Sequence, residues 1–257
     1  MQLAWSPDSQ RLLYAGDNAL IWDATTGQHR VTYHPLYNKP DTINQIPIQN
    51  VAWAPDQSQR VAIADGTTVR IINGRSGKVL LTGPKQTALS TTGAQPLSYL
   101  SQGTAAVRAL AWSPDGSKIA SSITTFSGNT DLRTITIWDS YTGAVLKQLT
   151  GHKDDIYQLA WSPDGKYLAI QARMQVGNNT LGTIVTRDEI QIWQVQTRKI
   201  ITHYTRDIHE GNGFEDFSWA PDSTRLISTV EDTTVARVWN ALTGQVLFTY
   251  QAEIASK

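Results

Sequence analysis

The chain has 257 residues, and its 22 Lys and Arg residues balance 22 Asp and Glu residues, so its formal net charge is zero. A neutral chain lacks the basic surface that binding to nucleic acid or to an anionic membrane requires, and we expect neither partner. It contains no cysteine, which excludes disulfide bonds, thiolate catalysis and cysteine-ligated metals. No apolar run predicts a membrane-spanning helix, and residues 1–5 lack the pattern of a signal peptide, so we expect a cytoplasmic protein.

A tryptophan followed by Ser-Pro-Asp or Ala-Pro-Asp recurs five times along the chain. Successive copies are 48 to 59 residues apart and begin at Trp5, Trp53, Trp112, Trp161 and Trp219. Repetition with this period indicates a propeller or a solenoid built from one supersecondary unit. We therefore expect these tryptophans and aspartates to have structural roles.

Each copy contains the same series of four predicted strands. The first strand is apolar and ends at the tryptophan. In the turn that follows, proline sets φ and the Asp side chain can accept a hydrogen bond from the backbone two residues later. After the second strand, a third shows the period-two alternation of a half-buried strand, as in Thr134–Trp138. A turn such as Thr142-Gly143 leads to the fourth strand. The second strands are expected near Leu12, Val61, Ile119, Leu168 and Leu226.

Four antiparallel strands per copy predict an all-β fold, a β-propeller of five four-stranded blades. We expect a single domain over residues 1–257. The predicted blades span approximately 1–33, 48–83, 105–150, 154–205 and 214–250. Because the chain begins within a first strand, two arrangements remain open. Either the five blades close into a ring, or they form part of a seven-bladed propeller from a longer parent. We slightly favour the second arrangement.

The third strands end in Trp22-Asp23 and Trp138-Asp139, and Gly151-His152 opens the fourth copy. With these dipeptides the chain resembles the WD40 repeat family, in the form that carries Trp-Ser-Pro-Asp turns. The resemblance implies a buried hydrogen-bonded set of His, Ser or Thr, Asp and Trp in each blade. It assigns structural repeat roles to Trp22, Trp138, His152, Asp188, Trp193 and Trp239.

No copy holds that set completely. The fourth copy has no hydroxyl on its second strand, Leu168–Ala172. The third has Ser121 or Ser122 with Asp131, but Gly103 stands where the histidine belongs. We therefore expect these blades to depend more on packing than on the network.

Connection lengths vary at one end of the blades only. The connections between second and third strands and between blades vary widely, whereas the other two are almost constant. Loops on a rigid scaffold commonly carry binding, so we expect it there. The candidate loops are Tyr33–Gln49, Gly83–Thr104, Thr124–Arg133, Met174–Glu189 and Thr205–Glu215.

The residue four positions before each repeat tryptophan is a second candidate for binding. In the WD40 family this position lies at the mouth of the pore and often contacts peptides. Arg and Tyr, which occupy it in two copies, are enriched at interface hot spots. The predicted partner-binding residues are Gln49, Arg108, Tyr157 and Glu215, together with Arg187 from the loop 174–189.

The sequence offers little for catalysis or for metal binding. Neighbouring His209 and Glu210 lack the spacing of a metal site, and we expect no metal and no cofactor. Glycoside hydrolysis needs two carboxyl groups at a defined separation. Only Glu215 in the predicted ring is acidic, with Asp155 and Asp216 near it. We therefore do not expect an enzyme.

The function that the sequence favours is a non-enzymatic WD40 repeat scaffold that binds a protein or peptide partner. One alternative is a small-molecule or glycan site in the pore, possibly hydrolytic, around Asp155, Glu215 and Asp216. Another is a periplasmic translocation-type propeller, because Trp-Ser-Pro-Asp-Gly also resembles the repeats of that family. The Trp-Asp dipeptides and the missing signal peptide count against this second alternative.

Overall fold

The structure is a computed structural model that describes residues 2–35, 48, 50–66, 68–83, 105–125, 133–152, 155–178, 184–205, 214–230 and 234–251. Residues 105–106, 124–125, 133, 151–152, 173–178, 184–187, 215 and 230 are described by their backbone alone. The chain divides into two compact units, residues 1–153 and 154–257, and each is considered by itself.

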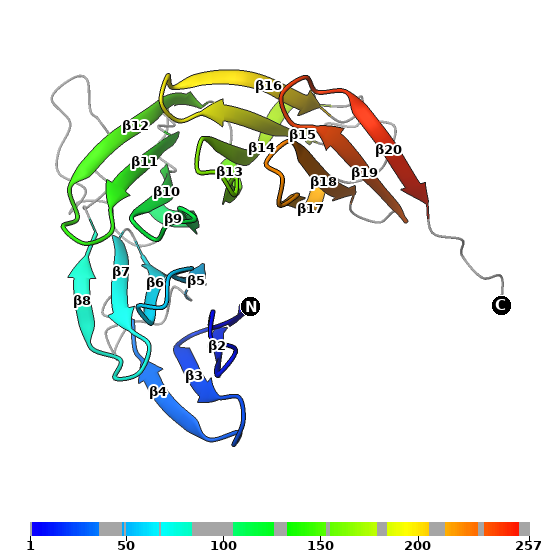
Figure 1. Cartoon of the computed structure of the whole chain (residues 1–257). Coiled ribbons are helices and arrows are strands. Elements are labelled where there is room, and N and C mark those ends of the chain that lie inside the picture. Colours follow the sequence, from blue (N-terminus) through cyan, green and yellow to red (C-terminus); the bar gives the residue numbers. More distant parts are fainter. Residues whose placement is uncertain are drawn as a thin grey trace, which may run out of the picture. The chain divides into compact units, whose positions relative to one another are not determined.

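Unit 1 contains three four-stranded antiparallel sheets, which we call blades 1 to 3 (Figure 1). Blade 1 comprises β1 (Gln2–Trp5), β2 (Arg11–Ala15), β3 (Ala19–Asp23) and β4 (His29–Tyr33). Blade 2 comprises β5 (Val51–Trp53), β6 (Arg60–Asp65), β7 (Thr68–Asn73) and β8 (Val79–Thr82). Blade 3 comprises β9 (Ala105–Trp112), β10 (Lys118–Thr125), β11 (Arg133–Asp139) and β12 (Val145–His152).

Unit 2 contains blades 4 and 5, with the same strand order. Blade 4 comprises β13 (Asp155–Trp161), β14 (Tyr167–Asn178), β15 (Ile184–Gln194) and β16 (Lys199–Thr205). Blade 5 comprises β17 (Phe214–Trp219), β18 (Arg225–Val230), β19 (Val235–Asn240) and β20 (Val246–Gln251). All regular structure in the described residues is therefore β-strand, which confirms the predicted fold class.

The strand register repeats from blade to blade. In every blade the tryptophan that ends the first strand pairs with the predicted second-strand residue, as Trp112 pairs with Ile119. That residue also pairs with the third-strand Trp or, in blade 2, with Ile72. Each sequence repeat therefore forms one blade.

The antiparallel order gives each blade two distinct ends. The connections from first to second strand and from third to fourth strand lie at one end, which we call the turn end. The connections from second to third strand and between blades lie at the other, which we call the loop end. The connections predicted to vary in length belong to the loop end, and most residues of four of the five candidate loops lie outside the described part of the chain. The fifth prediction, a loop over Met174–Glu189, is wrong, because β14 continues to Asn178 and pairs with β15 from Ile184 onward.

The Pro-Asp turns have the predicted hydrogen bond in all five blades. The Asp carboxylate accepts the backbone N–H two residues later at 2.8 to 3.2 Å. Hydrogen bonds from Ser113 and from the backbone and hydroxyl of Ser117 lower the pKa of Asp115 to about 2. These aspartates hold their own turns in shape, as the sequence predicts.

Neighbouring blades of unit 1 are packed through apolar layers. Between blades 2 and 3, the Trp112 ring lies in a cluster with alanines of blade 2, including Ala62 and Ala64. The Trp112 indole donates a hydrogen bond to the carbonyl of Ala52, at 3.0 Å. In unit 2 the Trp219 indole donates to the carbonyl of Ala160 in the same way, at 3.1 Å. In these two blades the repeat tryptophan therefore joins its blade to the preceding one.

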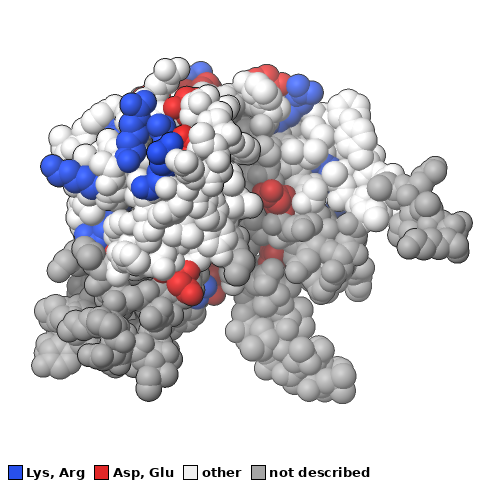
Figure 2. All heavy atoms as spheres, turned by 90° about the horizontal axis from the view of Figure 1, so that it is seen from below, with Lys and Arg blue, Asp and Glu red and all other residues white. Residues whose placement is uncertain are grey.

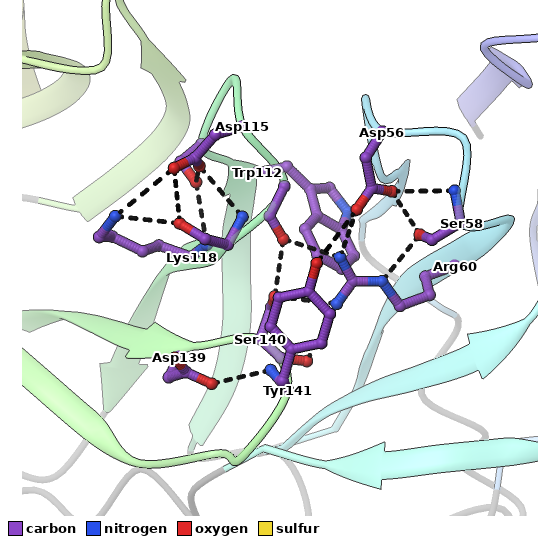
Figure 3. A network of polar contacts seen from close by, with 12 residues as sticks. Asp56, Ser58, Arg60, Trp112, Asp115, Lys118, Asp139, Ser140 and Tyr141 are labelled. Carbon is purple, nitrogen blue, oxygen red and sulfur yellow. Dashed lines mark hydrogen bonds and ion pairs between the residues drawn. The ribbon is translucent and has the colours of Figure 1, made fainter.

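Arg60 joins blades 2 and 3 at the turn end (Figure 3). Its guanidinium group lies between the rings of Trp112 and Tyr141, with its central carbon 4.9 and 4.1 Å from their centroids. It pairs with Asp56 at 2.7 Å and donates to the carbonyl of Gly116 at 2.8 Å and to the hydroxyl of Ser140 at 2.9 Å. Arg60 of blade 2 thus donates hydrogen bonds to acceptors of blade 3.

Candidate functional site

Three of the predicted partner-binding residues occupy the same kind of structural position. In the first strands of blades 3, 4 and 5, the pairing with the second strand shifts by one residue at Arg108, Tyr157 and Glu215. Each residue is the extra, unpaired residue of a β-bulge. Bulges redirect side chains and are over-represented next to functional sites. The alignment position singled out in the sequence is therefore structurally distinct.

The sequence contains a signal for these bulges that the pattern of strands alone does not reveal. Val107, Ile156 and Phe214 stand five residues before the repeat tryptophan, out of step with period-two alternation. All three are buried. An extra residue between two buried positions of one strand requires a bulge, because side chains of a regular strand alternate between faces.

Tyr157 lies on β13 in the half nearer the loop end, and its side chain is 43% exposed. Beside it, Gln158 crosses from blade 4 to blade 5, where its amide donates to the Asp216 carboxylate at 2.7 Å. The same amide donates to the carbonyl of Phe217 at 3.3 Å. The strand that carries the exposed Tyr157 is therefore fixed by hydrogen bonds to the first strand of blade 5.

The other predicted partner-binding residues are placed less completely. Arg108 is partly buried on β9 of unit 1. The backbone of Arg187 lies in β15 and pairs with Met174, whereas its side chain and that of Glu215 lie outside the description. Gln49 lies outside the described residues. A ring made from these residues would involve both units and remains a prediction.

The repeat tryptophans of the third strands use different hydrogen-bond acceptors in different blades. The Trp138 indole donates to Ser121 at 3.1 Å, and the Trp239 indole donates to Ser228 at 2.8 Å. In blade 4, where the second-strand hydroxyl is missing, the Trp193 indole donates to the side chain of Gln191 at 2.8 Å. A buried donor without an acceptor is costly, so Gln191 replaces the missing hydroxyl.

The remaining structural repeat residues also differ among blades. Asp188 is buried, and its carboxylate accepts the backbone N–H of Phe214 in blade 5 at 2.9 Å. The Trp22 ring stacks on Tyr14, with centroids 6.4 Å apart, and the edge of His29 approaches it. The backbone of His152 lies in β12, and its side chain is outside the description.

Charges at the turn end are neutralised locally. In every blade the turn aspartate pairs with a Lys or Arg two to four residues later, at N–O distances of 2.7 to 3.8 Å. Figure 2 shows Lys and Arg side chains gathered near one edge with Asp and Glu side chains beside them. Each turn aspartate therefore has a cation of its own blade beside it.

The described residues show neither a metal cluster nor a membrane span. Among the described side chains, no three His, Asp or Glu residues lie close enough to hold a metal ion. His209 and Glu210 lie outside that part of the chain. Within the same part, no helix has the length and apolar character needed to cross a membrane.

The repeated four-stranded blades define a β-propeller protein. The β-propeller domain of Cps50 (Swd1) from Myceliophteria thermophila is similar in fold, with a TM-score of 0.66 and 11% sequence identity. The similarity covers 98% of this chain and 72% of that one. It is one of 948 matching solved chains, so the fold by itself does not select a function.

The family model of the WD domain, G-beta repeat (WD40), matches residues 94–139 and 143–170. Together with the fold, this match supports the resemblance seen in the repeats: the chain is a β-propeller protein, and residues 94–139 and 143–170 match WD40 repeats. No curated protein matches the chain in sequence.

Proposed function

We propose that this protein is a non-enzymatic cytoplasmic scaffold that binds a protein or peptide partner at the loop end of its blades. WD40 β-propellers generally serve as scaffolds for protein interaction. The observation that carries the proposal is the repeated bulge at Arg108, Tyr157 and Glu215. A bulge at this position sets one residue of each blade apart from the regular strand, which suits a residue that contacts a ligand.

The chemistry of these positions suits a peptide. Within unit 2, the aromatic ring of Tyr157 can form a ring contact with an extended chain and the anion Glu215 can form a salt bridge with it. In unit 1, the cation Arg108 can pair with an acidic residue of a ligand. Arg and Tyr are also frequent hot spots because each combines a large apolar surface with polar groups. The blades hold these residues on strands, so little conformational entropy is lost on binding.

Site-specific photo-cross-linking tests the proposal in the source cell. A benzophenone amino acid replaces Tyr157 at the loop end or, as a matched control, Lys166 at the turn end of the same blade. The side chain of Lys166 is 70% exposed, so the probe there is at least as accessible. We expect a discrete cross-linked partner from position 157 and none from position 166.

Affinity measurements with the captured partner complete the test. We expect Arg108→Ala or Tyr157→Ala to weaken binding by roughly tenfold or more, as for interface hot spots. Lys166→Ala should leave the affinity unchanged. Cross-links that come from position 166 alone, or an affinity unaffected by both loop-end variants, would refute the proposed surface.

A further inference from the structure

The two middle strands of blade 4 extend past the other two at the loop end. β13 pairs with β14 only as far as Arg173, and β16 pairs with β15 only as far as Glu189. Beyond these residues β14 and β15 continue and pair with each other. We call this two-stranded extension, residues 174–178 of β14 and 184–188 of β15, the arm. Among the described residues, no third strand pairs with the arm.

The base of the arm is fixed to blade 5, which belongs to the same unit. The buried Asp188 carboxylate accepts the backbone N–H of Phe214 at 2.9 Å. The buried side-chain amide of Gln171 donates to the carbonyl of Phe214 at 2.7 Å. Both backbone polar groups of one residue in blade 5 are therefore held by the two strands that continue into the arm, so the arm starts from a defined position.

The two edges of the arm differ in regularity. On β14 the register shifts between Gln175 and Gly177, which leaves Val176 as an extra residue. Such a bulge is one of the devices that keep an edge strand from pairing with another chain. On β15 every residue from Ile184 to Asp188 has its own partner on β14. The edge of β15 is therefore the regular one.

The sequence of the β15 edge also lacks the usual protection. Edge strands commonly carry Lys or Pro, which hinder pairing with another chain. Residues 184–188 read Ile-Val-Thr-Arg-Asp and contain neither, and their two charged residues stand at the base of the arm. The three β-branched residues are typical of a strand with neighbours. Because a two-stranded ribbon is only marginally stable in water, a third strand would stabilise the arm.

We propose that the β15 edge of the arm binds a segment of the partner protein in extended conformation, which adds to blade 4 as an antiparallel strand. The inference rests on the proposed function and names its mode of binding. In this mode main-chain hydrogen bonds give affinity, and cross-strand side-chain pairs give preference. An acidic residue suits the position opposite Arg187, and apolar residues suit those opposite Val185 and Ile184. The preferred segment therefore reads acidic-x-apolar-apolar.

A second copy of the chain suits this edge less well than such a segment. When two β15 edges pair antiparallel about a two-fold axis at Thr186, Ile184 stands opposite Asp188 and Val185 stands opposite Arg187. Each charged residue then has an apolar residue as its cross-strand neighbour, so the charges gain no partner. A partner segment can place an acidic residue opposite Arg187 instead.

Fluorescence anisotropy with the full chain and the labelled peptide Thr-Glu-Thr-Val-Val-Thr tests the inference. We expect the wild-type chain to bind this peptide roughly tenfold more tightly than its Glu→Lys version, because an attractive cross-strand pair becomes a repulsive one. Arg187→Glu should reverse this preference. Lys199→Glu, at an exposed position of β16 near the turn end, is the matched control and should leave it unchanged. Far-UV circular dichroism establishes that both variants are folded.

Methylation of single peptide nitrogens distinguishes strand addition from side-chain docking. Successive residues of an antiparallel strand alternate between hydrogen-bonded and non-hydrogen-bonded positions. Of two peptides methylated at the first or the second valine nitrogen, one should bind at least tenfold more weakly and the other should bind like the parent. Equal binding of the two would overturn strand addition.

Two other results would overturn the proposed site. One is a parent peptide that does not bind the wild-type chain. The other is self-association of the chain, measured by sedimentation, that Arg187→Glu abolishes, because a second copy would then occupy the edge. Neither result bears on the cross-linking from Tyr157, so the proposed function is tested separately.

Discussion

Replacing Arg60 with methionine tests how the blades of unit 1 are held together. Arg60→Met keeps an apolar stem between the rings of Trp112 and Tyr141 but removes the guanidinium group. The variant loses the ion pair to Asp56 and the hydrogen bonds to Gly116 and Ser140. The same repeat position in blade 5 supplies a control, because Arg225 pairs with its own turn aspartate at the same 2.7 Å.

The burial of each arginine side chain sets the expected loss in the free energy of unfolding. The Arg60 side chain is 7% exposed, whereas that of Arg225 is 49% exposed. Removing one partner of a buried ion pair costs about 3–5 kcal/mol. Asp56 is 25% exposed and keeps a hydrogen bond from the Ser58 backbone, so water can solvate it and the lower value applies. We expect Arg60→Met to cost about 3 kcal/mol, and Arg225→Met at most about 1 kcal/mol.

Thermal unfolding followed by circular dichroism measures the difference. For a unit of this size, about 3 kcal/mol lowers the midpoint by roughly 6–12 °C. Arg60→Lys should fall between wild type and Arg60→Met, because an ammonium group keeps the charge but cannot reach several acceptors at once. If denaturant unfolding shows the same loss of unfolding free energy for Arg60→Met and Arg225→Met, the reasoning about the buried contact between blades is wrong.

Three further predictions concern other contacts. A Cβ at Gly74 would clash with the Trp53 ring, so Gly74→Ala should cost about 1–3 kcal/mol in denaturant unfolding, and should cost less in a chain that also carries Trp53→Leu. The pKa of Asp115 is lowered from 3.8 to about 2, so its contribution to folding stability is present above about pH 4 and is lost as the pH falls toward 2. Asp115→Asn should therefore reduce the change in unfolding free energy between about pH 4 and pH 2, measured by denaturant unfolding. Gln191→Leu removes the acceptor that Gln191 provides to the Trp193 indole and should cost about 1–3 kcal/mol in denaturant unfolding.

The sequence indicated which residues to consider for the candidate site, but it did not show that they lie at β-bulges. Alignment of the repeats singled out Arg108, Tyr157 and Glu215 because each stands four residues before a tryptophan. The break in alternation at Val107, Ile156 and Phe214 is visible in the sequence, but which residue is left unpaired depends on the partner strand, to which Ser122 and Ile123 belong in blade 3. The exposure of the Tyr157 side chain likewise depends on what packs around it.

The hydrogen bonds of the third-strand tryptophans were likewise predicted only in part from the sequence. The sequence indicates that blade 4 lacks the second-strand hydroxyl, and the structure agrees. That Gln191 replaces it could not be predicted, because the choice depends on which side chain reaches the Trp193 indole. Arg60 had a visible signal, one extra residue between Trp53 and Val61, but its partners lie in the next blade.

The sequence by itself determined the repeat, the four strands of each blade, the turns and the register. These follow from local physics: proline and aspartate set the turns, and alternation sets which residues face inward. Only the tertiary structure decided which contacts equivalent residues make. Trp53 and Trp112 carry the same local pattern and both are buried, yet of these two only the Trp112 indole meets a hydrogen-bond acceptor, because the acceptor must come from whatever group of the neighbouring blade lies opposite the indole.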